Sequence, residues 1–129
     1  MATPYTVKRL TDVEDSSPAV GLEETQEMRF ANEDLDAERT GVTHYRFGPG
    51  RRQAIGHRHE RAEEVYVVLA GSGRVKLDDD VVAIEPLDAV RVAPEVIRSF
   101  EAGPDGLEVL AVGARHDGDG EVLAGWWSD

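Results

Sequence analysis

The chain has 129 residues, a length that suggests one domain with a core of its own. Its formal net charge is −12, from 26 acidic and 14 basic side chains, which disfavours binding to nucleic acid or to anionic membrane surfaces. There is no cysteine, and no apolar run approaches the roughly 20 residues that a membrane helix needs. Residues 1–5 lack the basic and apolar segments of a signal peptide, so we expect a cytoplasmic protein.

The N-terminal part of the chain, residues 1–41, mixes short polar and apolar segments. We predict a strand at residues 5–10, followed by a loop at residues 11–21. Asn32 is a good N-cap, and the acidic residues that follow it favour a short helix at residues 33–38. This part is expected to flank the main body of the domain.

From residue 42 onward the pattern is that of β-strands separated by turns. The expected strands are 42–47, 65–69, 74–77, 81–84, 89–93, 97–101 and 107–112. The expected turns among them include 48–50, 71–73, 78–80 and 102–106. Short strands at this spacing, with glycine and proline between them, predict an all-β sandwich or barrel.

The C-terminal tail, residues 114–129, contains a glycine- and aspartate-rich stretch at 117–120 that we expect to be a loop. Trp126 and Trp127 nearly end the chain. Two tryptophans carry too much apolar area to stay in solvent. We therefore expect them to dock on the barrel or on a second subunit.

The stretch with most chemical content begins at His57 and His59. Residues two apart on a strand point to the same face, so both imidazoles can enter one cavity. Glu64 lies five positions beyond His59 and would face the other way on a continuous strand, so residues 60–63 must form a turn or bulge that resets the phase. Two imidazoles and one carboxylate then form a plausible site for a divalent transition metal. The alternative is a solvated polar turn between strands.

Two segments resemble the motifs of the cupin superfamily. Gly50, the His57-x-His59 pair, Glu64 and Gly71 resemble the first motif, and residues 86–98 resemble the second. The resemblance implies a small double-stranded β-helix, a jelly-roll barrel with its site in the open mouth. It also implies a single cupin domain over residues 1–129, with the barrel core at about 42–113.

The resemblance implies that His57, His59 and Glu64 are metal ligands, and that the metal is a divalent transition ion such as Zn, Fe, Mn or Ni. The histidine of the second motif is replaced by Arg98 in this chain. A guanidinium is always cationic and has no lone pair to offer a metal.

Two arrangements follow from Arg98. In the first, His57, His59 and Glu64 bind the metal, helped by His44 or water, and Arg98 clamps a carboxylate or phosphate of the substrate. In the second, Arg98 pairs with Glu64 and takes the place of the metal. Tyr66 either lines the cavity or packs in the core. His44 either points into the barrel or is hydrogen-bonded within its strand.

Two functions remain open at this point. One is a metal-dependent enzyme that acts on a small, anionic molecule through a reaction that the sequence does not identify. The other is a metal-free module that binds or senses a small molecule. The resemblance also implies a homodimer formed through an outer sheet.

Overall fold

The computed structural model of the chain describes residues 4–116 and 118–127. The strands are β1 (Gln26–Phe30), β2 (Thr40–Phe47), β3 (Ile55–His59), β4 (Glu64–Leu77), β5 (Asp80–Ile84), β6 (Ala89–Val92), β7 (Arg98–Ala114) and β8 (Gly120–Ala124). Two short 3₁₀ helices, Leu10–Asp12 and Pro18–Val20, precede them. Within the described residues, no helix is long and apolar enough to cross a membrane.

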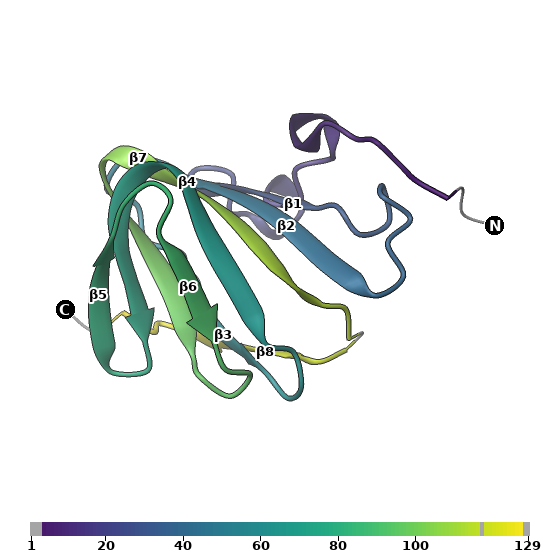
Figure 1. Cartoon of the computed structure of the whole chain (residues 1–129). Helices are drawn as coiled ribbons and strands as arrows, with labels where there is room; N and C mark the ends of the chain where they lie inside the picture. The colour runs from purple at the N-terminus through teal and green to yellow at the C-terminus, as the bar shows by residue number, and fades with distance from the viewer. Residues whose placement is uncertain (1–3, 117, 128–129) are drawn as a thin grey trace.

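The strands form one strongly curled sheet, and the prediction of an all-β fold is confirmed (Figure 1). Its central strand is β7, which pairs antiparallel with β2, β3 and β4. The order β1-β2-β7-β3-β8 continues the sheet to its edges, and β4 carries β5 and β6 on its other side. Strands that are distant in sequence therefore enclose a common interior.

The two longest strands, β4 and β7, bend together and so belong to both halves of the curled sheet. The expected turns at 71–73 and 102–106 are wrong, because both glycine-rich segments lie inside these paired strands, at shifts in their register. Gly71 has a φ of 75°, and a Cβ there would overlap the carbonyl oxygen of Gly106. Glycine here allows two backbones to approach closely and bend, rather than reversing the chain.

The core fills the space between the two halves of the sheet. Phe100 is its centre, with ring centroids 6.0 Å from Phe47 and 5.0 Å from Tyr66. Tyr45 stacks on Phe47 at 5.8 Å, and all four rings are buried. Burial of each such ring contributes on the order of 2 kcal/mol to folding.

The N-terminal predictions need correction. Residues 5–9 form no strand, and Val7 is 90% exposed, so it has no apolar surface to pack against. The expected helix at 33–38 is a series of hydrogen-bonded turns. The Asn32 side chain accepts a hydrogen bond from the Val42 amide instead of capping a helix, and Asp36 adopts a left-handed φ of 55°.

The tail docks on the barrel, one of the two predicted outcomes for its tryptophans. Trp127 Nε1 donates to Ser99 Oγ at 3.0 Å, and the Arg52 guanidinium lies 4.8 Å from the centroid of the Trp127 ring. Lys76 donates to the Trp126 carbonyl at 2.8 Å. The expected loop at 117–120 is only partly correct, because β8 begins at Gly120 and pairs with β3; Asp117 lies outside the described residues.

Candidate metal centre

The two histidines share one face of β3, as the spacing predicts. Their rings lie 5.3 Å apart, centroid to centroid, in an edge-on arrangement with an interplanar angle of 86°. The strand that carries them lies between β7 and β8, through the pairs His57–Arg98 and His57–Val122. Both imidazoles line a cavity of about 790 Å³ inside the curled sheet.

Glu64 reaches the histidines because the chain turns between β3 and β4. Asp119, which precedes β8, holds this turn: its Oδ1 accepts hydrogen bonds from the amides of Glu60 (3.1 Å) and Arg61 (3.0 Å), and its Oδ2 accepts one from the Ala62 amide (2.9 Å). The expected reset of phase at residues 60–63 is therefore present. Sequence reasoning missed Asp119, because it is more than fifty positions away from the turn that it stabilises.

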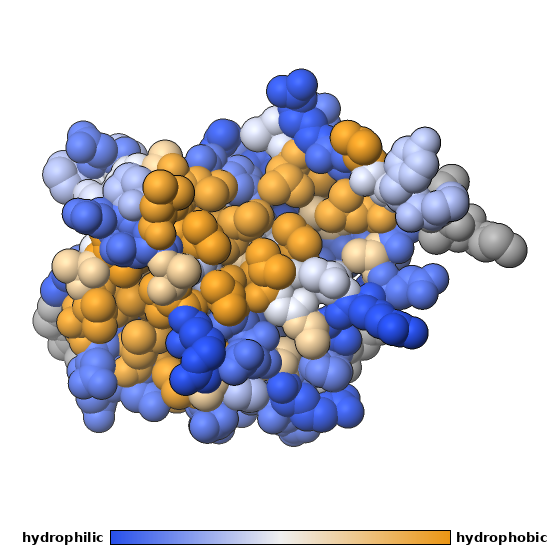
Figure 2. Space-filling view, in the orientation of Figure 1, coloured by the Kyte–Doolittle hydropathy of each residue, from blue (hydrophilic) through white to orange (hydrophobic). Residues whose placement is uncertain are grey.

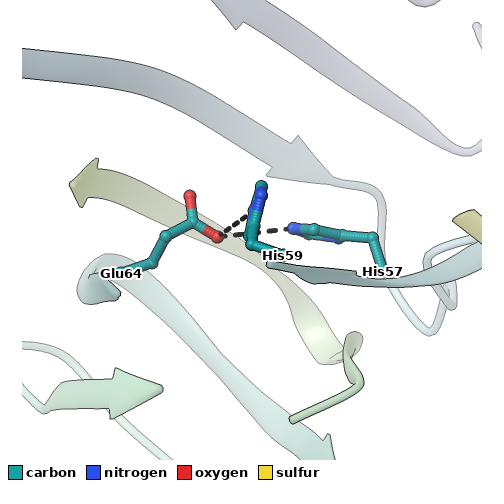
Figure 3. A group of neighbouring side chains, drawn as sticks. All are labelled: His57, His59 and Glu64. Carbon is teal, nitrogen blue, oxygen red and sulfur yellow. Dashed lines mark hydrogen bonds and ion pairs between the residues drawn. The ribbon is translucent and has the colours of Figure 1, made fainter. Parts of the chain in front are cut away.

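The three side chains meet at one oxygen atom, Glu64 Oε1 (Figure 3). His59 Nε2 lies 3.0 Å from it and His57 Nε2 lies 3.5 Å from it. One ligating atom from each of the three residues can be chosen so that all lie within 4.8 Å of one another. Asp119 Oδ2 also lies 3.6 Å from His59 Nδ1, on the side of the ring away from Glu64.

Tyr66 joins the core to this cluster. Its ring is fully buried against Phe100, and its hydroxyl donates to Glu64 Oε1 at 2.7 Å. The same hydroxyl lies 3.2 Å from His57 Nε2. Both alternatives for Tyr66 are therefore observed, since its ring packs in the core while its oxygen contacts the cluster.

Arg98 lies behind the cluster rather than on the wall of the cavity. Its side chain is 0% exposed; Nη2 donates to the Ala93 carbonyl at 2.9 Å, and Nη1 lies 3.6 Å from Glu64 Oε1. Its Nε and Nη1 atoms have no hydrogen-bond partner within the described residues. This guanidinium does not line the cavity, and its approach to Glu64 agrees with the second arrangement expected from the sequence; a direct clamp on a substrate stays a prediction.

His44 is not brought to the cluster. Its Nε2 lies 2.9 Å from Glu108 Oε2, which also accepts a hydrogen bond from Arg46 Nε at 2.6 Å. Thr43 and Tyr45, its neighbours on β2, line the cavity, so His44 points to the opposite face of the sheet. Of the two alternatives for His44, the structure shows the hydrogen-bonded one.

The carboxyl of Glu64 is held in its ionised form. Burial alone would raise its pKa, but hydrogen bonds from His57, His59 and Tyr66 outweigh burial and hold the pKa well below the ordinary value. Burial raises the pKa of the Tyr66 hydroxyl, and the negative charge of Glu64 raises it further. The lowered pKa of Glu64 favours its ionised form near pH 7, and the raised pKa of Tyr66 favours a neutral phenol.

These donors suit a divalent transition metal. Two imidazole nitrogens and one carboxylate oxygen form the set that zinc, iron, manganese and nickel sites use, and a cavity beside them leaves coordination positions open for a ligand. The carboxylate beside His59 Nδ1 is of the kind that orients metal-binding histidines. Arg98 disfavours a metal ion at this site, because its positive charge lies 3.6 Å from Glu64 Oε1.

Comparison with known proteins agrees with this geometry. Residues 43–113 match the model of a cupin domain, and the chain belongs to the cupin family. Its fold is therefore the double-stranded β-helix barrel that the sequence motifs predicted. No curated protein sequence matches the chain closely enough to count as a relative.

Several solved structures share the fold. A cupin protein from Bacteroides fragilis is 18% identical, with a TM-score of 0.72, and the similarity covers 91% of this chain and 89% of that one. The polyketide cyclase RemF from Streptomyces resistomycificus is 22% identical, with a TM-score of 0.73 and coverage of 96% and 89%. A sugar phosphate isomerase of the cupin superfamily from Silicibacter pomeroyi is 14% identical, with a TM-score of 0.72 and coverage of 93% of both chains. At these identities the likeness concerns the fold.

Proposed function

We propose that this cupin binds one divalent transition metal through His57, His59 and Glu64, and binds a small anionic molecule beside it in the cavity. The observation that carries the proposal is the convergence of the three ligating atoms, within 4.8 Å of one another, on the wall of that cavity. When bound, the metal would act as a Lewis acid on an oxygen atom of the ligand. Two structures of similar fold are named as enzymes, a cyclase and an isomerase, which supports catalysis as the outcome.

The charges near the cluster favour an anionic ligand. A divalent ion together with Arg98 and the Glu64 carboxylate leaves the buried centre with an excess of positive charge. Net charge in a partly dry cavity is costly, and an anionic oxygen from a ligand offsets it. Arg98 thus favours an anion through its charge, although it lies outside the wall of the cavity and makes no contact there.

Elemental analysis of untagged protein, after incubation with zinc, manganese, iron or nickel and removal of free metal, tests the proposal. We expect stoichiometric metal in the wild type and none in the His57→Ala/His59→Ala double variant. His44→Gln is the matched control, since it changes a histidine that points to the opposite face of the sheet and does not line the cavity. Absence of metal from reconstituted wild-type protein would exclude the metal.

A metal-free binding module is the second candidate. It is favoured by the 3.6 Å approach of the buried Arg98 Nη1 to Glu64 Oε1, an ion pair that balances its own charge. In this case Arg98 and Glu64 stabilise each other, and the histidines bind the ligand directly. The same elemental analysis separates the two candidates, because the module would contain no metal in any of the four reconstitutions.

We also propose a homodimer formed through the outer face of the sheet. Figure 2 shows apolar side chains gathered on the face of the molecule that includes β4. Half-buried or exposed residues form this outer apolar face on three paired strands: Val42, Val65, Val67, Leu69, Leu110 and Val112. Apolar patches of this kind mark protein interfaces. A cytoplasmic location remains a prediction from composition.

The dimer is tested by light scattering on the purified protein. Val67→Glu places a charge on the outer apolar face, and we expect it to give a monomer. Val7→Glu, in an exposed part of the N-terminal segment, is the control and is expected to leave a dimer. A wild-type monomer at high protein concentration would exclude the homodimer.

A further inference from the structure

The wall of the cavity around the cluster is mainly apolar. Its apolar side chains come from β1, β2, β3 and β8 and from the segment that precedes β1: Leu22, Met28, Phe30, Tyr45, Ile55 and Val122. A cavity of about 790 Å³ is within the usual range for small-molecule sites, roughly 300–1,000 Å³. Such a wall can bury a molecule with an extended apolar surface.

Several apolar side chains on this wall are largely exposed to solvent. Val20 and Val122 are each 62% exposed and Phe30 is 48% exposed, and all three line the cavity. Exposed apolar residues scattered singly over a surface need no explanation, but three on the wall of one hollow indicate a binding surface. Contact with a ligand would remove their apolar area from water.

The charged groups of the wall favour a ligand with one acidic group over a ligand with several. Arg98 is absent from the wall, and among the described wall residues the one guanidinium is that of Arg115. It is already bonded to the Ala37 carbonyl, at 2.7 Å, and to Glu33. Three carboxylates, those of Glu64, Asp119 and Glu121, also lie on this wall, so a doubly charged phosphate would meet more negative than positive side chains there. The His57–His59–Glu64 cluster can therefore bind one acidic oxygen of the ligand.

Among the described wall residues, one buried side-chain oxygen lacks a hydrogen-bond donor. Gln26 is 4% exposed and lines the cavity, and its Oε1 has no hydrogen bond within the described residues. Its Nε2 contacts the sulfur of Met28 at 3.6 Å. A buried carbonyl oxygen without a donor is costly, and a hydroxyl on a ligand would supply that donor.

We infer that the ligand is an aromatic hydroxy acid: a flat apolar body against Phe30, Tyr45 and Val122, one carboxylate or phenolate at the His57–His59–Glu64 cluster, and a hydroxyl for Gln26. The inference rests on the proposed ligand site and names the class of molecule that the site takes. Aromatic side chains on the wall stack well against a flat ring. A sugar phosphate, which is polar over its whole surface, would leave this wall without contact.

Isothermal titration with 6-hydroxy-2-naphthoate and with glucose 6-phosphate tests the inference. The protein is used in zinc-loaded and zinc-free forms. We expect the naphthoate to bind at least roughly tenfold more tightly than the sugar phosphate. Phe30→Ser should weaken naphthoate binding by roughly tenfold, and Gln26→Leu by roughly fivefold. Leu87→Ser, which removes an 84% exposed apolar side chain outside the cavity, is the control and should bind as the wild type does.

Equal or tighter binding of glucose 6-phosphate, or naphthoate binding that Phe30→Ser leaves unchanged, would overturn the inference. Zinc uptake without naphthoate binding also overturns it, while the metal part of the proposed function stands. Naphthoate binding without zinc uptake supports the inference and overturns the metal. Circular dichroism melting of each variant shows that a loss of binding is not a loss of fold.

Discussion

The donor cluster and the apolar wall of the cavity are built from different parts of the chain. His57, His59 and Glu64 lie within residues 43–113, which match the cupin domain. Phe30 precedes that region and Val122 follows it. The difference teaches that the residues matched to the cupin domain carry the cluster, whereas segments outside the match carry Phe30 and Val122, on the wall that we propose selects the ligand.

The two regions also differ in how they are stabilised. The cluster is half-buried and charged, and removal of any of its groups would leave a hydrogen-bond or ion-pair partner unsatisfied. Phe30 and Val122 on the wall are about half exposed or more and contribute little to the core. Substitutions in the cluster should therefore change stability, and substitutions in the wall should change binding alone.

The largest effect is expected from Arg98→Met. This change removes the buried cation beside Glu64 and should lower the free energy of unfolding by about 3 kcal/mol, measured by urea denaturation. Arg91→Met is the matched control, because the pair between Arg91 and Glu63 is exposed and should contribute less than about 1 kcal/mol. Equal effects of the two substitutions would show that Arg98 does not stabilise the cluster.

The next effect concerns Asp119, which connects β8 to the turn before Glu64. Asp119→Ala leaves the amides of Arg61 and Ala62 without an acceptor, whereas the Glu60 amide keeps the Asp119 carbonyl at 3.2 Å, and the change should cost about 1–3 kcal/mol in urea denaturation. It should also weaken zinc binding by roughly tenfold, since the carboxylate beside His59 is lost. A variant that loses stability but keeps full zinc affinity would limit Asp119 to a structural role.

A smaller effect is expected at Glu101, at the end of the barrel where Trp127 docks. Burial raises its pKa, but ion pairs with Arg52 and Arg74 outweigh burial and hold the pKa below its ordinary value. The ionised Glu101 carboxylate therefore stabilises the fold above the ordinary pKa of a glutamate. This stabilisation is lost as the pH falls through the lowered pKa of the folded state.

Glu101→Gln should cost less than about 1 kcal/mol near pH 7, and the difference from the wild type should shrink as the pH falls below about 4. Urea denaturation at several pH values measures both quantities. A difference that is constant with pH would assign the effect to packing and not to charge.

The smallest effect on stability belongs to the wall. Phe30→Ser should change the free energy of unfolding by less than about 1 kcal/mol, because the side chain is 48% exposed, although the same change should weaken ligand binding. Thermal melting and urea denaturation measure the stability. A large loss of stability in Phe30→Ser would show that Phe30 belongs to the core. The cluster and the wall would then not differ in how they are stabilised.

The fold and the cluster could be predicted from sequence because both depend on short-range patterns. His57 and His59 could be placed on one face because side chains two apart on a strand point the same way. Glu64 could be placed beside them once a turn was assumed between His59 and Glu64. The motif of the family supplied the fold. The alternating runs after residue 42 supplied the all-β class.

The remaining features depend on contacts between distant residues. Gly71 and Gly106 were interpreted as parts of turns, because local chemistry does not distinguish a chain reversal from two strands that bend together. Asp119 and the wall residues were missed, since their roles arise from neighbours far away in sequence. Arg98 was expected either to contact a ligand in the cavity or to pair with Glu64, and its strand position alone does not reveal that the side chain is completely enclosed.

The pairing of β3 has a consequence for the order in which the protein is made. This strand, which carries both histidines, pairs with β7 and β8, and both follow it by about forty residues or more. A chain that emerges from the ribosome with its N-terminus first exposes His57 and His59 long before their strand has a partner. The metal site that we propose would therefore be assembled only after β7 and β8 have been synthesised.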